Sequence, residues 1–161
     1  MNEYSAAQNY LETTRALFRY YRELGDKALA QIGDEHIHWQ PTPESNSVAV
    51  VVKHMSGNML SRFTNFLTED GEKPWRNRDA EFEKNDYASK AELLNAWQEG
   101  WNCFFQALDP LTEADLGRIV YIRNQGHTVL EALNRQLAHY AYHTGQIVFL
   151  CRMLTGENWQ T

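Results

Sequence analysis

The chain has 161 residues, which is the size of one ordinary domain, and we expect residues 1–161 to form a single domain. Hydrophobic residues make up 43% of the chain and charged residues 22%, a balance that excludes a mainly disordered protein. The net charge is −6 and no run of Lys or Arg occurs, so the chain lacks the electrostatic footprint of a nucleic-acid-binding protein, and we expect no such partner.

The first predicted element is a long helix. Apolar residues recur at three- and four-residue steps over residues 4–32, which is the period of one helix face. Gly33 ends this helix, and Gly25 is a second position at which it can bend or break. Residues 34–43 then form a loop.

A second helix is predicted over residues 48–68, with Asn46 or Ser47 as its N-cap. Its β-branched start, residues 48–52, also fits a buried strand, but the length of the apolar pattern favours a helix. The polar and irregular stretch 72–79 that follows is expected to be a surface loop or a loop that lines a site.

A third helix is predicted from Ser89 to residue 109, because Ser89 and Glu92 have the spacing of a capping box. After it, the β-branched residues 119–122 and a turn at residues 124–126 indicate a short β-hairpin.

The last predicted element is a fourth helix. Thr128 and Glu131 form a second capping box, and the helical pattern runs to Leu154 and stops at Gly156. Each of the four helices carries a wide apolar stripe that must be buried against a neighbour. We therefore predict an all-α fold, a four-helix bundle with a short β-hairpin before the last helix.

Two further expectations concern the cell compartment and the thiols. The start of the chain lacks the basic and apolar regions of a signal peptide, and no apolar run is long enough to span a membrane. We expect a cytoplasmic protein without a membrane partner. Cys103 and Cys151 are isolated, so we interpret them as buried small hydrophobic residues rather than as a disulfide, a metal site or nucleophiles.

Histidine is the residue type that points to chemistry, since no nucleophile elbow, P-loop or dinucleotide-binding motif occurs. His139 and His143 lie four residues apart in the fourth helix, so they share a face and are separated by about 6 Å along the axis. Two such imidazoles can bind one metal ion. On spacing alone, a hydrogen-bonded or half-exposed pair is the more common outcome.

A third histidine strengthens the metal hypothesis. His54 lies in the middle of the second helix, within an apolar stripe where an unpaired imidazole would be costly. Three neutral imidazoles with one open position are typical of a catalytic Zn²⁺ site or a related transition-metal site. His36 and His38 lie in a loop and His127 lies beside a cap, so we interpret these three as surface or capping groups.

Three stretches of the chain, 46–58, 71–79 and 134–147, resemble the DinB/YfiT-like superfamily. The signature His-x-x-x-His-x-Gly-Gln of the fourth helix, combined with a histidine in the second, carries the resemblance. It implies an up-down-down-up four-helix bundle with one long crossover. It also implies a divalent metal, Zn²⁺ or Ni²⁺, bound by His54, His139 and His143. Members of the superfamily include thiol-dependent S-transferases or isomerases and metal-dependent hydrolases.

The leading functional hypothesis is therefore a metal-dependent enzyme that acts on a small molecule. No obvious carboxylate lies on the histidine faces, and hydrolysis needs a general base, so activation of a low-molecular-weight thiol is favoured over hydrolysis. The alternative is a non-catalytic helical module with a structural or vestigial metal site. His36, His38 or Gln146 would then be the fourth ligand.

Other polar residues are candidates for the surroundings of this site. Arg76 and Arg78, beside Trp75, can hold a carboxylate of the substrate, or they form local salt bridges with Asp79 and Glu81. Three residues one helical step from the histidines are expected at the rim of the metal rather than among its ligands: Asn58, Arg135 and Gln146. Ordinary hydrogen bonds between helices are the alternative for all three, and the favoured one for Arg135.

Aromatic residues lead to one more prediction, a homodimer. We expect these large rings to exceed what one core can bury, and aromatic residues are enriched at interfaces. The rings in question are Tyr10, Tyr20, Tyr21, Trp97, Trp101, Phe104 and Phe105.

Overall fold

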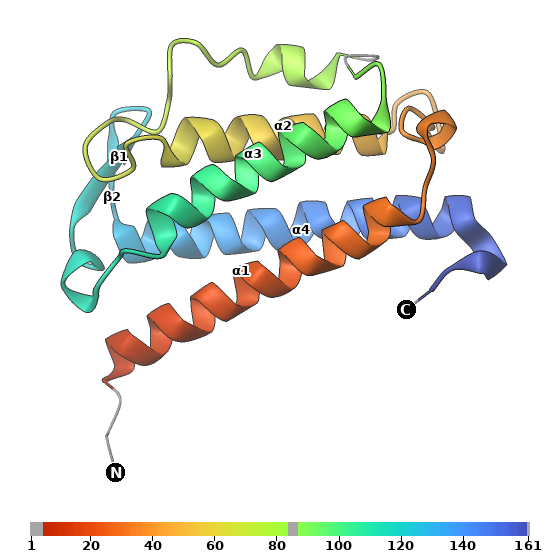
Figure 1. Cartoon of the computed structure of the whole chain (residues 1–161). Coiled ribbons are helices and arrows are strands. Elements are labelled where there is room, and N and C mark those ends of the chain that lie inside the picture. The colour runs from red at the N-terminus through yellow and green to blue at the C-terminus, as the bar shows by residue number, and fades with distance from the viewer. Residues whose placement is uncertain (1–4, 84–86, 161) are drawn as a thin grey trace.

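A computed structural model describes residues 5–83 and 87–160 (Figure 1). It contains four long helices and one two-stranded antiparallel sheet that directly precedes the last helix. The helices are α1 (Ala6–Ala30), α2 (Val48–Phe63), α3 (Lys90–Leu108) and α4 (Val129–Thr155), and the strands are β1 (Ile119–Ile122) and β2 (Gln125–Thr128). The expected helical fold with a hairpin before the last helix is confirmed at this level.

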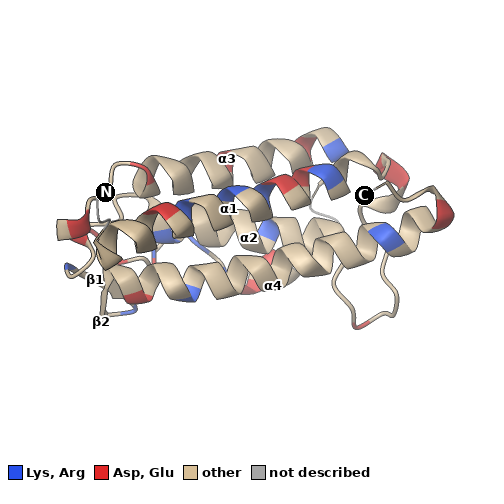
Figure 2. Ribbon diagram, turned by 90° about the horizontal axis from the view of Figure 1, so that it is seen from below, with Lys and Arg blue, Asp and Glu red and all other residues tan. Residues whose placement is uncertain are grey.

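The four helices lie side by side, with α1 and α4 running in one direction and α2 and α3 in the other (Figure 1). The core between them is apolar and rich in aromatic rings, including the fully buried Phe18, Trp101, Phe104 and Tyr140. On the surface, acidic and basic residues both occur along the helices seen in Figure 2. None of the described helices is long and apolar enough to pass through a bilayer.

Helix α1 is continuous through Gly25, so the alternative of a break at this position does not occur. Its N-cap is Ser5, whose hydroxyl accepts a hydrogen bond from the backbone N–H of Gln8, and residue 4 lies outside the described part of the chain. Gly25 serves close packing instead: a Cβ placed there would lie 2.4 Å from Cζ2 of Trp97. The glycine therefore brings α1 close to α3.

Helix α2 starts as expected but ends early. Ser47, rather than Asn46, is the N-cap, because its hydroxyl accepts from the N–H of Val50. The predicted end at residue 68 is wrong, since the helix stops at Phe63 and Asn65 has a φ of 52°. The apolar residues Phe66 and Leu67 continue the hydrophobic pattern in a turn, and periodicity alone does not distinguish such a turn from helix.

The connection between α2 and α3 is long because these helices run in the same direction (Figure 1). It contains the short 3₁₀ helix η2 (Asp79–Phe82), which packs on α2. Side chains of α2 hold the connection at both ends: Ser61 and Arg62 donate hydrogen bonds to the carbonyl of Gly71, and Lys53 donates to the carbonyl of Ala80. The expected irregular loop is thus fixed along α2.

The predicted capping boxes differ in outcome. At α4 the box is complete, since Thr128 accepts from the N–H of Glu131 and Glu131 accepts from the N–H of Thr128. At α3, Ser89 caps the helix, but Glu92 accepts from the N–H of Ala88, one residue before the cap.

The hairpin turn lies one residue earlier than predicted. Ile122 pairs with Gln125, so Arg123 and Asn124 form a two-residue turn, with φ values of 55° and 59°. A hairpin turn of this kind requires positive φ at both central residues. Both oxygens of Asp70 accept hydrogen bonds from this turn, at 2.9 Å from the N–H of Arg123 and 2.8 Å from that of Asn124.

The Asp70 contacts predict an acid-sensitive hairpin. Partial burial acts to raise the pKa of Asp70, but three backbone N–H donors outweigh it and hold the pKa below the usual 3.8. Such a group stabilises the fold fully above its unfolded pKa, and this contribution disappears as the pH falls through the lowered folded pKa. We expect Asp70→Asn to reduce the unfolding free energy at pH 6, with the difference from the parent shrinking below pH of about 3.8 in urea titrations. A constant difference across that range would contradict this role.

The aromatic residues lie mostly in the core. Trp97, Trp101, Phe104 and Phe105 are all at most 9% exposed, so these four do not make an external surface. Of the seven rings in the dimer argument, Tyr20 is well exposed, at 54%. The homodimer stays a prediction, and four of the seven rings on which it was based are not available for an interface.

Candidate metal centre

Three histidines from the neighbouring helices α2 and α4 meet at one point between these helices. His54 from α2 and His143 from α4 are buried, and His139 from α4 is half-buried. The Nε2 atom of His139 lies 3.1 Å from Nε2 of His54 and 3.0 Å from Nε2 of His143. The structure therefore brings together the three residues that the sequence singled out.

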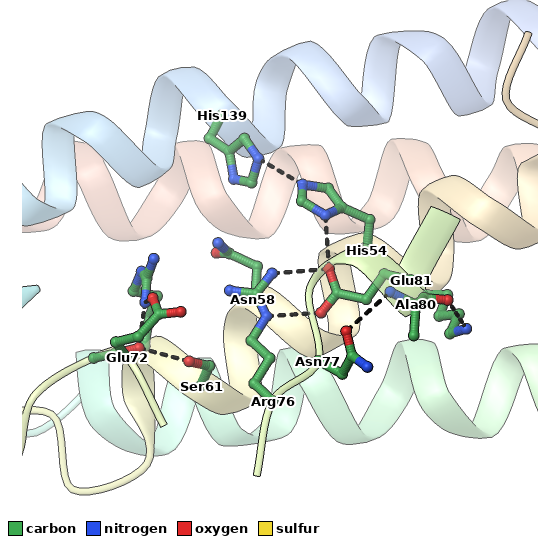
Figure 3. A network of polar contacts seen from close by, with 12 residues as sticks. His54, Asn58, Ser61, Glu72, Arg76, Asn77, Ala80, Glu81 and His139 are labelled. Atoms are coloured by element: carbon green, nitrogen blue, oxygen red, sulfur yellow. Dashed lines mark hydrogen bonds and ion pairs between the residues drawn. The ribbon is translucent and has the colours of Figure 1, made fainter. Parts of the chain in front are cut away.

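The outer nitrogen of His54 contacts a carboxylate. Nδ1 of His54 lies 2.9 Å from Oε2 of Glu81, which belongs to η2 and approaches α2 from the connection (Figure 3). Arg76 donates two further hydrogen bonds to Glu81, of 2.7 and 2.9 Å. The prediction of no obvious carboxylate concerned the histidine faces of the helices, and the carboxylate of Glu81 reaches His54 from the connection instead.

Glu81 is ionised in this setting. Burial acts to raise its pKa, but the hydrogen bonds with His54 and Arg76 outweigh the burial and lower the pKa below its usual value. A carboxylate accepts hydrogen bonds, so Nδ1 of His54 carries the proton and donates it to Glu81. In the neutral form of the His54 ring, Nε2 then holds only a lone pair.

His143 is oriented in the same way by a neutral partner. Its Nδ1 atom lies 2.7 Å from Oε1 of Gln146, and Nε2 of Gln146 donates to the hydroxyl of Tyr142 at 3.2 Å. With the amide oxygen as acceptor, the Nδ1 atom of His143 is the donor. Nε2 of His143 also holds only a lone pair.

Proton counting shows that the three Nε2 atoms cannot satisfy one another. His139 has at most one proton at Nε2 and can donate it to only one of its two neighbours. In the neutral cluster at least one of these close N···N contacts therefore has no well-aimed hydrogen bond, which is unfavourable unless a cation binds the lone pairs. Two nitrogens at 2.0–2.1 Å from a tetrahedral ion are about 3.3 Å apart. The two contacts of His139 come within a few tenths of an ångström of that spacing, and all three ligand atoms lie within 4.8 Å of one another.

His139 and His143 are also held in the neutral state that metal binding requires. Burial lowers the pKa of His139 to about 3, and the nearby His143 and His54 add to the shift. Burial likewise lowers the pKa of His143, and the hydrogen bond that His143 donates to Gln146 opposes this shift. Neutral rings can offer their lone pairs to a cation.

Other residues with ligand atoms lie elsewhere. Within residues 5–83 and 87–160, the cluster of His, Cys, Asp and Glu close enough to share an ion consists of the three histidines. His38 contacts the carbonyl of Tyr87, and His36 lies in the loop before α2. Cys151 is buried, as expected, and burial raises its pKa to about 12, whereas Cys103 is half-buried.

The histidine cluster opens on a cavity of about 290 Å³, which we call the arginine pocket. His54, His139, Asn58 and Gln136 line it together with five arginines: Arg62, Arg76, Arg78, Arg123 and Arg135. A larger cavity, of about 460 Å³, lies beside Cys103 and does not include these histidines.

The other sequence-predicted residues are placed as follows. Gln146 contacts His143, whereas Asn58 and Arg135 line the arginine pocket. Arg76 forms the local salt bridge with Glu81 that was the alternative to substrate binding, and Arg78 lies over the ring of Phe82. Trp75 is 58% exposed and is not among the residues that line the pocket.

The sequence indicates Glu81 only as a salt-bridge partner of Arg76 or Arg78, and its contact with His54 was missed. Glu81 lies 27 residues from His54 in an irregular segment, and a lone glutamate there has no periodic signal. Gly57 is the one indirect sign: a Cβ at this position of α2 would lie 2.3 Å from Oε1 of Glu81. The glycine leaves the space that the carboxylate occupies.

Similarity to known proteins gives the family of the chain. No curated protein matches it. Among solved structures, it is similar to the crystal structure of a conserved protein from Enterococcus faecalis, with a TM-score of 0.65 and 18% identity over 96% of this chain and 99% of that one, which shows a shared fold. The profile of a family described as a protein of unknown function, DUF1572, matches residues 5–161. Because this match covers almost the whole sequence, the chain belongs to the DUF1572 family.

Proposed function

We propose that His54, His139 and His143 bind one divalent cation, Zn²⁺ or Ni²⁺, and that the protein is a metal-dependent enzyme for a small molecule. The observation that carries the proposal is the meeting of three Nε2 atoms while Glu81 and Gln146 occupy the Nδ1 atoms of two of the rings. Carboxylate and amide acceptors of this kind typically orient metal-binding histidines.

A catalytic role is favoured over a structural one by the surroundings of the cluster. Structural zinc sites are closed by four protein ligands, whereas catalytic sites keep a position open. In the described part of the chain, the cluster has three ligating residues, and His54 and His139 line the arginine pocket. Gln146, a candidate fourth ligand, uses its oxygen for Nδ1 of His143 instead.

When bound, a divalent cation supplies Lewis-acid chemistry at this position. The roles of the protein residues follow from their contacts. Glu81 fixes the tautomer and orientation of His54, and Arg76 holds Glu81. Since both oxygens of Glu81 accept hydrogen bonds, this carboxylate is a positioning group rather than a free base.

Thiol-dependent transfer remains the favoured reaction class, with hydrolysis second. No carboxylate with a free oxygen is among the residues that line the pocket, which is unfavourable for general-base hydrolysis. The thiol would come from a low-molecular-weight cosubstrate, because Cys151 is buried with a raised pKa and Cys103 lines the other cavity. The helix directions in Figure 1 and the three histidines support an up-down-down-up bundle of the DinB/YfiT-like type.

The metal hypothesis predicts a defined metal content. We expect about one Zn²⁺ or Ni²⁺ per chain in the purified protein, measured by inductively coupled plasma mass spectrometry, and near-complete loss of it after His54→Ala, His139→Ala or His143→Ala. His36→Ala, which removes a histidine outside the cluster, should leave the content unchanged. Metal content equal to that of the parent in all three variants would exclude this site.

A further inference from the structure

Half of the ten arginines of the chain line one cavity beside the histidine cluster. They come from four separate places in the fold: Arg62 from α2, Arg76 and Arg78 from the connection, Arg123 from the hairpin turn and Arg135 from α4. The protein as a whole carries a net charge of −6, so general basicity does not account for this concentration. The arginine pocket is a local positive site on an acidic protein.

The arginine pocket contains more guanidinium groups than carboxylates that pair with them. Glu72 pairs with both Arg62 and Arg123, at 3.1 and 3.0 Å. Glu81 pairs with Arg76 at 2.7 Å. Two carboxylates thus face five guanidinium groups.

Arg78 and Arg135 are the arginines of the pocket whose positive charge is not paired with a described carboxylate. Both are exposed, and neither forms an ion pair or a side-chain hydrogen bond with any residue in the described ranges 5–83 and 87–160. Arg78 lies with its guanidinium 5.6 Å from the centre of the Phe82 ring, and the same ring lies 5.0 Å from that of His54. Unused guanidinium donors therefore lie next to the metal ligands.

Two amides add hydrogen-bonding capacity to the pocket. Tyr140, whose pKa burial raises well above 10, donates its hydroxyl proton to Oδ1 of Asn58 at 2.9 Å. This fixes the amide of Asn58 and leaves its NH₂ group as a donor. Gln136 is 97% buried, and its Oε1 atom makes no hydrogen bond with any described residue. A buried amide oxygen without a partner is costly, and a ligand hydroxyl or N–H group would satisfy it.

The hairpin turn holds Arg123 in an uncommon conformation. A positive φ is unusual for a residue with a long side chain, and glycine, asparagine or aspartate normally occupies such a position. Asp70 stabilises this turn through two backbone N–H groups, as described above. The structure thus keeps a guanidinium at a position where local conformation favours another residue.

We infer that the arginine pocket binds a small anion, a phosphate group or a pair of carboxylates, that forms part of the substrate or cosubstrate processed at the three histidines. Guanidinium groups match both anions because they donate two parallel hydrogen bonds in a plane. The free donors of Arg78, Arg135 and Asn58 would bind the anion, while Gln136 would accept from a neighbouring hydroxyl or amine. This inference names the substrate class of the proposed enzyme and so rests on the proposed function.

The test is calorimetric titration of the protein as purified with two probes, inorganic phosphate and citrate. The variant Arg78→Gln/Arg135→Gln removes the two guanidinium groups that form no ion pair or side-chain hydrogen bond with the described residues, so the fold should survive. We expect binding to the parent that weakens with salt, and a loss of roughly tenfold or more in the double variant. The control variant is Arg152→Gln, which also removes an exposed arginine, near the end of α4 and outside the pocket. It should bind both probes as the parent does.

The two probes separate the two anion classes: tighter binding of phosphate assigns a phosphorylated ligand, and tighter binding of citrate assigns a polycarboxylate. No binding of either probe to the parent, or an equal loss in Arg152→Gln and the double variant, would overturn the inference. The metal content of the same samples is measured separately. Arginine-dependent anion binding by a protein that contains no metal would support the anion site and refute the metal hypothesis. Stoichiometric metal without anion binding would support the metal hypothesis and refute the anion site.

Discussion

Replacing Glu81 by alanine should lower the free energy of unfolding by about 3–5 kcal/mol, because it leaves the buried guanidinium of Arg76 without its carboxylate. The side chains of Arg76 and Glu81 are only 3% and 6% exposed, so solvent cannot compensate for the loss. Urea denaturation of the metal-free protein measures this effect. The same change removes the acceptor of the His54 Nδ1 proton, and we expect cation affinity to fall about 10–100-fold in chelator competition.

Two control variants separate charge from orientation at this position. Glu81→Gln keeps an oxygen that accepts from His54, so it should retain more cation affinity than Glu81→Ala while still leaving Arg76 unpaired. The double variant Arg76→Met/Glu81→Met removes both charges and should be more stable than Glu81→Ala by at least about 1 kcal/mol. A Glu81→Ala protein as stable as its parent would show that the ion pair contributes nothing to the fold.

Alanine at Gly25 should destabilise the protein by about 1–3 kcal/mol, although alanine is the better helix former by about 1 kcal/mol. The reason is the close approach of α1 to Trp97, whose ring carbons lie 2.4 and 2.7 Å from the position of the new Cβ. The ring cannot easily move away, since it is 2% exposed and its Nε1 donates to Asp26 at 2.6 Å.

The chain contains a matched control for this prediction. Gly145 lies in the interior of α4, and a Cβ there would have no neighbour within 4 Å. Gly145→Ala should therefore stabilise the metal-free protein by about 0.5–1 kcal/mol. Opposite signs for the two substitutions in urea denaturation would confirm that packing decides the effect at Gly25, and a stabilising Gly25→Ala would contradict the close approach.

The helices were predictable because their signals are local. Ser89, Thr128 and Glu131 mark helix starts through contacts over three or four residues, and these contacts are present in the structure. The end of α2 was not predictable, since apolar residues continue past Phe63 although the backbone turns. The turn at Arg123 was also missed, because Asp70, a residue distant in sequence, supports its conformation.

In the candidate site, too, the features with local sequence signals were predictable and those that depend on distant residues were not. The histidine positions follow from the spacing of His139 and His143 and from the place of His54 within an apolar helix. Their orientation was not predictable, because it depends on Glu81 in the irregular connection and on the space at Gly57. The arginine pocket was likewise outside the reach of sequence reasoning, as its residues are close together only in the folded chain.

The separation of the ligands along the chain has a consequence for synthesis on the ribosome. His54 lies 85 residues before His139, and the other two proposed ligands, His139 and His143, both belong to α4. A nascent chain that has exposed α2, the connection and α3 holds one ligand and its carboxylate partner, but no complete site. Under the proposed metal site, cation capture would therefore wait until α4 has left the ribosome, and loading of a partly folded chain that lacks α4 with the wrong cation would be disfavoured.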